Sequence, residues 1–391
     1  MRFSKRTSWA TNSNLLAAKL AQKRRAGHAI IDLTESNPTR CSFRYLKPNL
    51  LKPFLYKRNL RYEPDPKGLL KTREAVARYY SDKKVKINPE DIFITAGTSE
   101  AYSFLFHLLA DAGEAIASPR PSYPLFDYLA DMNDVKLVRY PLVYQDGWQI
   151  AKNSLEKCFK NKPKALIVLN PNNPTGNFVS ANERVFINEL CAKKNAAIIS
   201  DEVFLDFAWN GPPPRTFADN KQVLTFTLSG ISKILGLPQM KLSWIVVSGP
   251  EPLKKKAIER LEIIADTYLS ANTPSQHALP VWFKNREKTL REILDRLLTN
   301  RTYLEKAFED IGGVQLMQSQ GGWYSTIRCR SGLSDEELAI FFLEHHNILI
   351  YPGFFFDFPQ EGHFVLSQLV PEEDYKMGIN CLYKGLIKLG L

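Results

Sequence analysis

Long apolar runs are missing from this 391-residue sequence: no stretch of 18 apolar residues exists, so nothing in it predicts a membrane-spanning helix. Cysteine is scarce, with five residues scattered along the chain and no Cys-x-x-Cys pair. That pattern argues against a zinc site or a disulfide framework and favours reduced thiols in a cytoplasmic protein. Repeats and low-complexity segments are absent too. The composition, 44% hydrophobic and 24% charged, is that of a globular chain long enough for two domains.

Acidic residues are sparse at the beginning of the chain. Residues 1–70 contain 15 Lys and Arg against 4 Asp and Glu, which accounts for the whole net charge of +11. A nucleic-acid surface is one interpretation. No recognisable binding module accompanies these charges, however, and anionic cofactors or substrates also attract basic residues. We therefore expect small anionic ligands rather than nucleic acid.

The first 31 residues contain no acid, as a transit peptide would. An ordered arm is the better interpretation, because Asn12 or Ser13 can cap a helix that starts near Leu15 and stops at Gly27. We expect residues 1–45 to form an N-terminal arm that packs on a small C-terminal domain.

The middle of the chain alternates short apolar runs with helical patterns. Runs such as Ala165–Leu169 are apolar throughout, which is typical of strands covered on both faces in a mainly parallel sheet. These runs predict a large α/β domain over residues 46–275 with a seven-stranded sheet between helices. The predicted strands are Asp91–Thr95, Ala115–Ser118, Val135–Tyr140, Ala165–Asn170, Ala196–Val203, Val223–Ser229 and Ser243–Ser248.

The alternation of short strands and helices ends near residue 275. A long charged helical region, 281–311, is followed by short strands and a closing helix from Glu372 to Leu389, which predicts a smaller α+β domain over residues 276–391. The strands are expected at Gly322–Arg328, Ile348–Tyr351 and His363–Leu369. A ligand site between the two domains is expected.

Three segments carry polar groups just after predicted strands: Asn170–Gly176 (Asn-Pro-Asn-Asn-Pro-Thr-Gly), Ser200–Phe204 and Ser229–Lys233. Open α/β sheets bind ligands at the carboxyl ends of their strands. An amide, a carboxylate and a lysine amine should therefore meet at one point. Such a set suits pyridoxal phosphate, whose aldehyde forms a Schiff base with lysine.

Two of these residues have a chemical reason to be there. Lys233 lies 32 residues after Asp201 and among apolar neighbours, where a desolvated amine becomes a nucleophile; a surface lysine at a strand end is the simpler alternative. Asp201 ends an apolar strand, where an unpaired carboxylate is costly. A protonated pyridine nitrogen would be a suitable partner, and a helix N-cap is the alternative.

Weaker signals surround this pair. The turn at Gly97, Thr98 and Ser99 opens a helix, so its backbone N–H groups and hydroxyls can cradle a phosphate, or simply cap the helix. Asn173 lies in an Asn-Pro-Thr-Gly sequence that is also a good turn signal. Tyr123 can stack on a cofactor ring or pack in a core.

In combination these segments resemble the class I/II aminotransferases, pyridoxal-phosphate enzymes of fold type I, from about Asp32 to the C-terminus. The resemblance implies a Schiff base on Lys233, a contact of Asp201 with the pyridine nitrogen and a contact of Asn173 with the ring hydroxyl. It implies a phosphate site at the 97–99 turn and ring stacking by Tyr123. Further cofactor contacts are implied for Phe204, Ser229, Ser232 and Lys241.

Tyr62, in Tyr-Glu-Pro-Asp-Pro-Lys-Gly-Leu, matches a tyrosine that in the family reaches the phosphate of the neighbouring subunit. The resemblance therefore implies a homodimer whose active sites are shared across the interface.

Two departures concern the cofactor. Phe204 stands where the family has a tyrosine, which leaves Asn173 as the sole contact to the ring oxygen, so we expect the Schiff base to lose its proton at a higher pH than usual. Lys241 stands where the family has a phosphate-binding arginine, and it keeps the charge but loses the two-pronged donor.

A third departure concerns the substrate. Val365 replaces the arginine of a C-terminal Arg-x-Ser that binds the substrate α-carboxylate. Either another cation takes over or the substrate is not an ordinary α-amino acid. Arg40, beside Asn37 in a segment that usually lines the substrate pocket, is the first candidate cation, and Arg328 is the second.

Aromatic residues also fall near segments that contact substrate in relatives, namely Trp323, Tyr324 and Phe354–Phe356. They favour an apolar or aromatic substrate side chain, although core packing explains them equally well.

These observations predict an aminotransferase of amino acid metabolism that moves an amino group between an amino acid and a 2-oxo acid, with Lys233 as general acid/base. A lyase, decarboxylase or synthase on the same cofactor is the alternative, because fold and cofactor do not fix which bond breaks. A non-catalytic regulator is disfavoured, since the chain carries no added helix-turn-helix domain.

Overall fold

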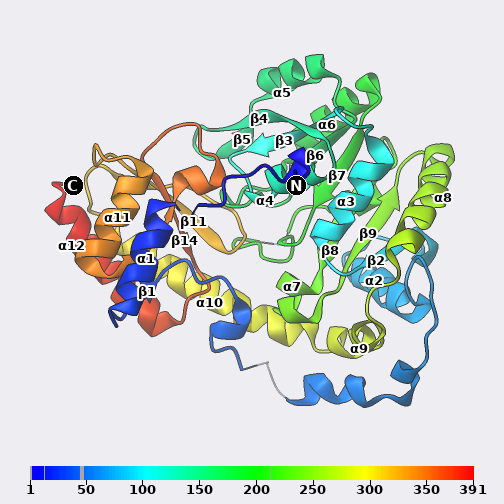
Figure 1. Ribbon diagram of the computed structural model, residues 1–391, viewed down its shortest axis with the longest axis horizontal. Helices are drawn as coiled ribbons and strands as arrows, with labels where there is room; N and C mark the ends of the chain where they lie inside the picture. Colours follow the sequence, from blue (N-terminus) through cyan, green and yellow to red (C-terminus); the bar gives the residue numbers. More distant parts are fainter. Residues whose placement is uncertain (1, 13, 45–47, 212) are drawn as a thin grey trace.

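The computed structural model describes residues 2–12, 14–44, 48–211 and 213–391. Ser13 and the predicted domain boundary after residue 45 lie outside the described residues. A large sheet with helices on both faces makes up one side of the molecule, and a smaller lobe that contains both the C-terminal helices and α1 makes up the other (Figure 1). No described helix is both long enough and apolar enough to cross a membrane.

The described part of the large sheet has eight strands in the order β2-β9-β8-β7-β6-β3-β4-β5. Its strands are β2 (Ile92–Thr95), β3 (Ala115–Arg120), β4 (Lys136–Tyr144), β5 (Trp148–Ile150), β6 (Ala165–Leu169), β7 (Ala197–Asp201), β8 (Thr225–Gly230) and β9 (Ser243–Ser248). All seven predicted strands are present. The central ones, from β8 to β4, run parallel, and β9 is antiparallel to both of its neighbours.

The predicted count of seven strands was wrong by one, because β5 was missed. This strand folds back on β4 as an antiparallel hairpin through Asp146 and Gly147, which both have positive φ. Asp-Gly is a strong hairpin signal. The hairpin also lengthens β4 beyond its predicted end at Tyr140.

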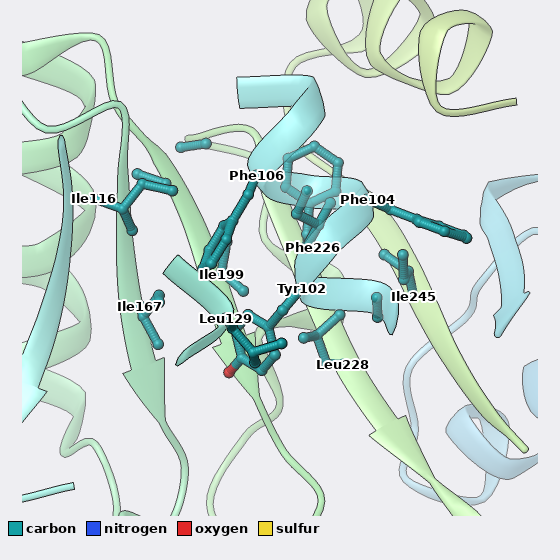
Figure 2. Packing of buried hydrophobic residues seen from close by; sticks show 14 of the residues in the cluster. Tyr102, Phe104, Phe106, Ile116, Leu129, Ile167, Ile199, Phe226, Leu228 and Ile245 are labelled. Atoms are coloured by element: carbon teal, nitrogen blue, oxygen red, sulfur yellow. The ribbon is translucent and has the colours of Figure 1, made fainter. Parts of the chain in front are cut away.

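Both faces of the central strands are buried, as their uninterrupted apolar sequences predicted. Ile167 of β6 packs in one hydrophobic cluster, whereas its neighbours Leu166 and Val168 pack in another. Figure 2 shows the first cluster, in which Tyr102 and Phe106 lie against the strands. The helices on that face are α3 (Thr98–Leu109), α4 (Leu125–Met132) and α8 (Glu251–Tyr268), and those on the other are α5 (Lys152–Cys158) and α6 (Ala181–Lys194).

The smaller lobe is built on an antiparallel sheet of order β10-β11-β14-β13. Its strands are β10 (Val314–Leu316), β11 (Tyr324–Cys329), β13 (Tyr351–Pro352) and β14 (His363–Ser367), and its helices are α11 (Asp335–His346) and α12 (Glu372–Lys388). The single strand predicted over 348–351 is divided in two. Its first part, β12 (Ile348–Leu349), pairs instead with β1 (Ile31–Asp32) near the N-terminus.

The N-terminal arm contacts both lobes. Helix α1 (Leu15–Arg25) is capped by Asn14, whose side chain accepts a hydrogen bond from the Ala17 N–H, whereas the sequence predicted Asn12 or Ser13 as the cap. The helix packs on α11, and Leu16 enters the core of the small lobe. Nearer the terminus, Trp9 reaches α4, where its indole N–H donates to Asp131 at 2.8 Å.

Four further helices are α2 (Leu70–Asp82), α7 (Ile231–Ile234), α9 (Thr273–Phe283) and α10 (Arg286–Ala307). Of these, α10 contacts both α7 and α12 and so runs between the two lobes. Leu279 and Trp282 of α9 are buried in the same cluster as Val76 of α2 and Trp244 of β9. We therefore propose that the large domain extends through α9, to about residue 285, rather than ending at residue 275.

Candidate active site

Three predicted site residues, Asn173, Asp201 and Lys233, line one cavity of about 310 Å³. They follow β6, end β7 and follow β8, which are adjacent parallel strands, so their carboxyl ends meet at one edge of the sheet. The convergence of an amide, a carboxylate and an amine that the sequence predicted is present in the structure.

Asp201 is buried at this edge and accepts two hydrogen bonds. The Tyr102 hydroxyl donates to Oδ2 at 3.0 Å, and the Val203 backbone N–H donates to Oδ1 at 3.2 Å. Burial raises the pKa of Asp201 to about 6, because desolvation disfavours the charged form more than these hydrogen bonds favour it. A cation that entered the cavity beside Asp201 would stabilise the carboxylate.

Lys233 faces the same cavity from α7. Burial lowers the pKa of its amine to about 8, and the negative charge of Asp201 partly opposes that shift. The Nζ atom lies 4.8 Å from the ring centroid of Trp323 and 5.4 Å from that of Phe204. At neutral pH the unprotonated fraction of this amine is therefore much larger than that of an ordinary lysine, and the unprotonated amine is the form that acts as a nucleophile or general base.

The start of α3 reaches the cavity through Thr98, whereas the predicted phosphate-site residue Gly97 is not among the residues that line it. Gly97 occupies the N-cap position of this helix, where no side chain accepts a hydrogen bond from the first backbone N–H groups. A Cβ atom placed on Gly97 would have no other atom within 4 Å, so the space beside it is open. Thr98, at the helix start, lines the cavity. Open space before a long helix N-terminus is suited to an anion, since free N–H groups and the helix dipole both favour negative charge.

Aromatic side chains close the rest of the cavity. Tyr123 is 44% exposed and lies edge-on to Phe126. Phe204 and Tyr324, which also line the cavity, are buried. Ser232 also lines the cavity, as the sequence predicted.

Several predicted site residues do not line this cavity. Ser99 is exposed one position beyond the α3 start, and the Ser229 hydroxyl is turned toward the Glu202 carbonyl oxygen at 3.4 Å. Lys241 is an exposed residue in the left-handed region after a short 3-10 helix, Pro238–Met240. Trp323 is fully buried behind the cavity, beneath the Lys233 amine.

The predicted replacement cations are also elsewhere. Arg40 belongs to a short helical turn capped by Asn37, has a side chain that is 75% exposed and lies near Glu35 at 3.7 Å. The Asn37 side chain is occupied by this cap, where it accepts from the Thr39 N–H. Arg328, on β11, borders a separate surface hollow with Arg330. Local turn geometry decides these orientations, and the sequence pattern did not reveal it.

Sequence reasoning missed three polar residues of the site. Ser36 and Tyr351 line the cavity, and Tyr102 holds Asp201. Tyr102 lies four residues after Thr98, one helical turn along the same face of α3, and that spacing could have identified it. For Ser36 and Tyr351 only the tertiary fold provides the signal.

This fold and cavity define a class of protein: α/β enzymes of the aminotransferase fold, with a large mixed sheet and a small antiparallel domain. The structure is similar to that of alanine aminotransferase from Pyrococcus furiosus, with a TM-score of 0.90 and 26% identity over 99% of this chain and 100% of that one. It also resembles an aspartate aminotransferase variant from Thermus thermophilus, with a TM-score of 0.87 over 98% of this chain and 100% of that one, at 20% identity.

Sequence relatives agree. The chain is 26% identical to the glutamate-pyruvate aminotransferase AlaA of Escherichia coli over 81% of this chain and 80% of the relative. It is 26% identical to the alanine aminotransferase of Mycobacterium tuberculosis over 92% and 86% of the two chains. Residues 9–380 match the family model of aminotransferase class I and II, and the chain belongs to that family.

The predictions of family, fold and aminotransferase activity are thereby confirmed. Class I/II aminotransferases use pyridoxal 5'-phosphate, and their substrates are amino acids and 2-oxo acids. The described cavity fits that cofactor. Asn173, Asp201 and Lys233 bring an amide, a carboxylate and an amine to one cavity that Thr98 also lines, and the space beside the start of α3 is open to an anion.

Proposed function

We propose that this aminotransferase works through Lys233 and Asp201, and that its cavity selects amino acids with apolar side chains. The bound cofactor would supply an electron-withdrawing ring that acidifies the proton on the substrate α-carbon. The buried pair of a low-pKa lysine and a carboxylate at the edge of the sheet is the observation that carries the proposal.

Each residue of the site has a defined task in this proposal. Lys233 would hold the cofactor aldehyde and would move a proton as general acid/base, for which a pKa near 8 is well matched to neutral pH. Asp201, held in place by Tyr102, would stabilise a positive charge on the pyridine nitrogen. Thr98 and the start of α3 would bind the phosphate, and the Asn173 amide N–H would donate to the ring oxygen.

The chemistry of the walls supports the choice of substrate. Among the described residues that line the cavity, Lys233 is the only lysine or arginine, and most of the others are aromatic or aliphatic. A second carboxylate on the substrate, as in glutamate or aspartate, would find no arginine or second lysine among these described residues and would lose hydration. The named activities of the alanine aminotransferase relatives make alanine the first small donor to test.

The cofactor-loaded protein tests this proposal when it is mixed with single amino acids in the absence of any 2-oxo acid. We expect alanine and phenylalanine to convert the bound cofactor to its amino form, visible as a change in the absorption spectrum. Glutamate and aspartate should react at least about tenfold more slowly, because burying an unpaired charge is unfavourable. Faster reaction with the dicarboxylic amino acids, or no reaction with any of the four, would contradict the proposal.

We further propose a homodimer with shared active sites. Tyr62 is 75% exposed and does not line the cavity of its own chain. Large apolar side chains are exposed on the same stretch, which runs along the lower edge of the molecule in Figure 1 and includes Leu51, Leu55 and Leu60. Exposed apolar surface of this kind is typical of protein interfaces.

A cytoplasmic location stays a prediction of the sequence.

A mixture of two inactive or weakened variants tests the shared site. In a hybrid of Lys233→Ala and Tyr62→Ala subunits, one cavity would contain both an intact Lys233 and the partner's Tyr62. We expect the hybrid to bind cofactor about tenfold more tightly than the Tyr62→Ala homodimer, as measured by activity at limiting cofactor. If hybrids perform no better than the Tyr62→Ala homodimer, the sites are not shared through this residue.

A further inference from the structure

One wall of the cavity carries hydroxyl groups and no charge. Ser36, Tyr324 and Tyr351 line it, and they come from the N-terminal arm, β11 and β13. Burial raises the pKa of both tyrosines above the ordinary value. Side-chain hydrogen bonds, of Tyr324 with Ser36 and of Tyr351 with Thr34 and Ser36, only partly oppose this rise, so both phenols stay neutral at physiological pH. We call these three residues the hydroxyl wall.

The hydroxyl wall lies next to the position of the missing arginine. Tyr351 and Val365 are direct partners in the antiparallel pairing of β13 with β14, and such partners project to the same face of a sheet. Val365 is fully buried in one cluster with Tyr324 and Phe356, against which Tyr351 also packs. Ring contacts of Tyr351 with Phe356 at 5.6 Å and of Tyr324 with Phe356 at 6.3 Å fix both phenols.

Two arginines, Arg40 and Arg120, are paired with acidic residues that do not belong to the hydroxyl wall. Arg40 lies near Glu35 and is mostly solvated. Arg120 pairs with Asp357 at 3.1 Å. The negative charge of Glu35 acts on both tyrosines and raises their pKa, which makes this side of the cavity less favourable for a second anion.

We propose that the hydroxyl wall binds the group that substrates carry on the α-carbon beside the amine, and that it recognises this group as a neutral hydrogen-bond acceptor rather than as an anion. This inference rests on the proposed function and names its substrate class. The enzyme accepts amino acids whose carboxylate is neutralised as an amide nearly as well as free amino acids. A bidentate arginine would instead favour the carboxylate strongly.

Two unreactive ligands test the inference in the cofactor-loaded protein. They are 3-phenylpropanoate and 3-phenylpropanamide, which share an apolar side chain and lack an amine on the α-carbon. The first carries a carboxylate and the second a neutral amide in the same position. Calorimetric titration should give dissociation constants within about tenfold of each other, as expected for hydrogen bonds from neutral donors. The readout is binding and does not depend on amino-group transfer.

Three variants sharpen the test. Val365→Arg should tighten the carboxylate by about tenfold or more while leaving the amide unchanged, because only the anion gains a charge-assisted pair. Tyr351→Phe should weaken both ligands by a similar factor of a few. Tyr303→Phe, which removes a hydroxyl bonded to Asn380 in the small lobe, is the matched control and should change neither.

Three results would contradict the inference. A wild-type preference for the carboxylate above about 100-fold would show that a cation binds it and would overturn the inference. So would unchanged binding of both ligands in Tyr351→Phe, or failure of both to bind wild-type protein. Because binding is scored separately from the spectral reaction with amino acids, loss of the proposed function would leave this ratio intact, and an unexpected ratio would leave the proposed function intact.

Discussion

Lys233→Ala should lower kcat for amino-group transfer by about 10²-fold to 10⁴-fold, the usual contribution of a positioned proton-transfer group. The variant loses both the amine that holds the cofactor and the base that moves the proton, while the cavity walls remain. Steady-state kinetics with alanine and a 2-oxo acid measure the loss. Adding ethylamine should partly restore the rate, because a free amine can enter the space that the side chain leaves.

The matched control for this experiment is Lys193→Ala. Lys193 is exposed near the end of α6, away from the cavity, and its removal should leave kcat within twofold of wild type. A kcat for Lys233→Ala within tenfold of wild type, without any effect of ethylamine, would remove Lys233 from the mechanism.

Asp201→Asn should separate stability from activity. The pKa of Asp201 in the folded protein, about 6, lies above its ordinary value of 3.8. The folded state therefore binds the proton more tightly than the unfolded state, and this carboxylate costs stability as pH rises from about 4 through 6. At pH 9, where Lys233 is largely neutral, the cofactor-free variant should be more stable than wild type by up to about 2 to 3 kcal/mol.

Activity should change in the opposite direction. Loss of the fixed negative charge should lower kcat by about 10²-fold or more, because an amide does not stabilise a cation on the cofactor ring. Urea unfolding of the cofactor-free protein between pH 5 and pH 9 and kinetics of the loaded protein are the two measurements. Destabilisation by 2 kcal/mol at pH 9 together with an unchanged kcat would make Asp201 a structural residue.

A second buried aspartate provides the contrast. Asp206 accepts a hydrogen bond from the Tyr79 hydroxyl at 2.6 Å and pairs with Lys83, and it does not line the cavity. Asp206→Asn should destabilise the protein, since it leaves a partly buried lysine without its anion. Its kcat should stay close to wild type.

The features that the sequence predicted well are those that local patterns determine. Ala165–Leu169 is apolar at every position because β6 is buried on both faces. An uninterrupted apolar run of this length predicts such a strand directly from the sequence. Asp201 and Lys233 could be found because the first ends a buried strand, β7, and the second lies three residues after another, β8. Strand order then brought them together without any further information.

The features that were missed depend on tertiary contacts. Tyr351 is separated from Ser36 by more than 300 residues, and only the pairing of β13 with β14 and of β12 with β1 brings both to the cavity. Arg40 was a reasonable candidate by charge, but a short turn held by Asn37 directs it into solvent. Hydrophobic pattern and charge do not encode such orientations.

The most direct test of this account is to reduce the cofactor-loaded protein with borohydride, digest it and locate the attached cofactor by mass spectrometry. The account predicts a single labelled peptide that contains Lys233, with the label absent from Lys233→Ala and retained in Lys193→Ala. A label on any other lysine, or no covalent label in protein that is shown to bind the cofactor, would contradict it.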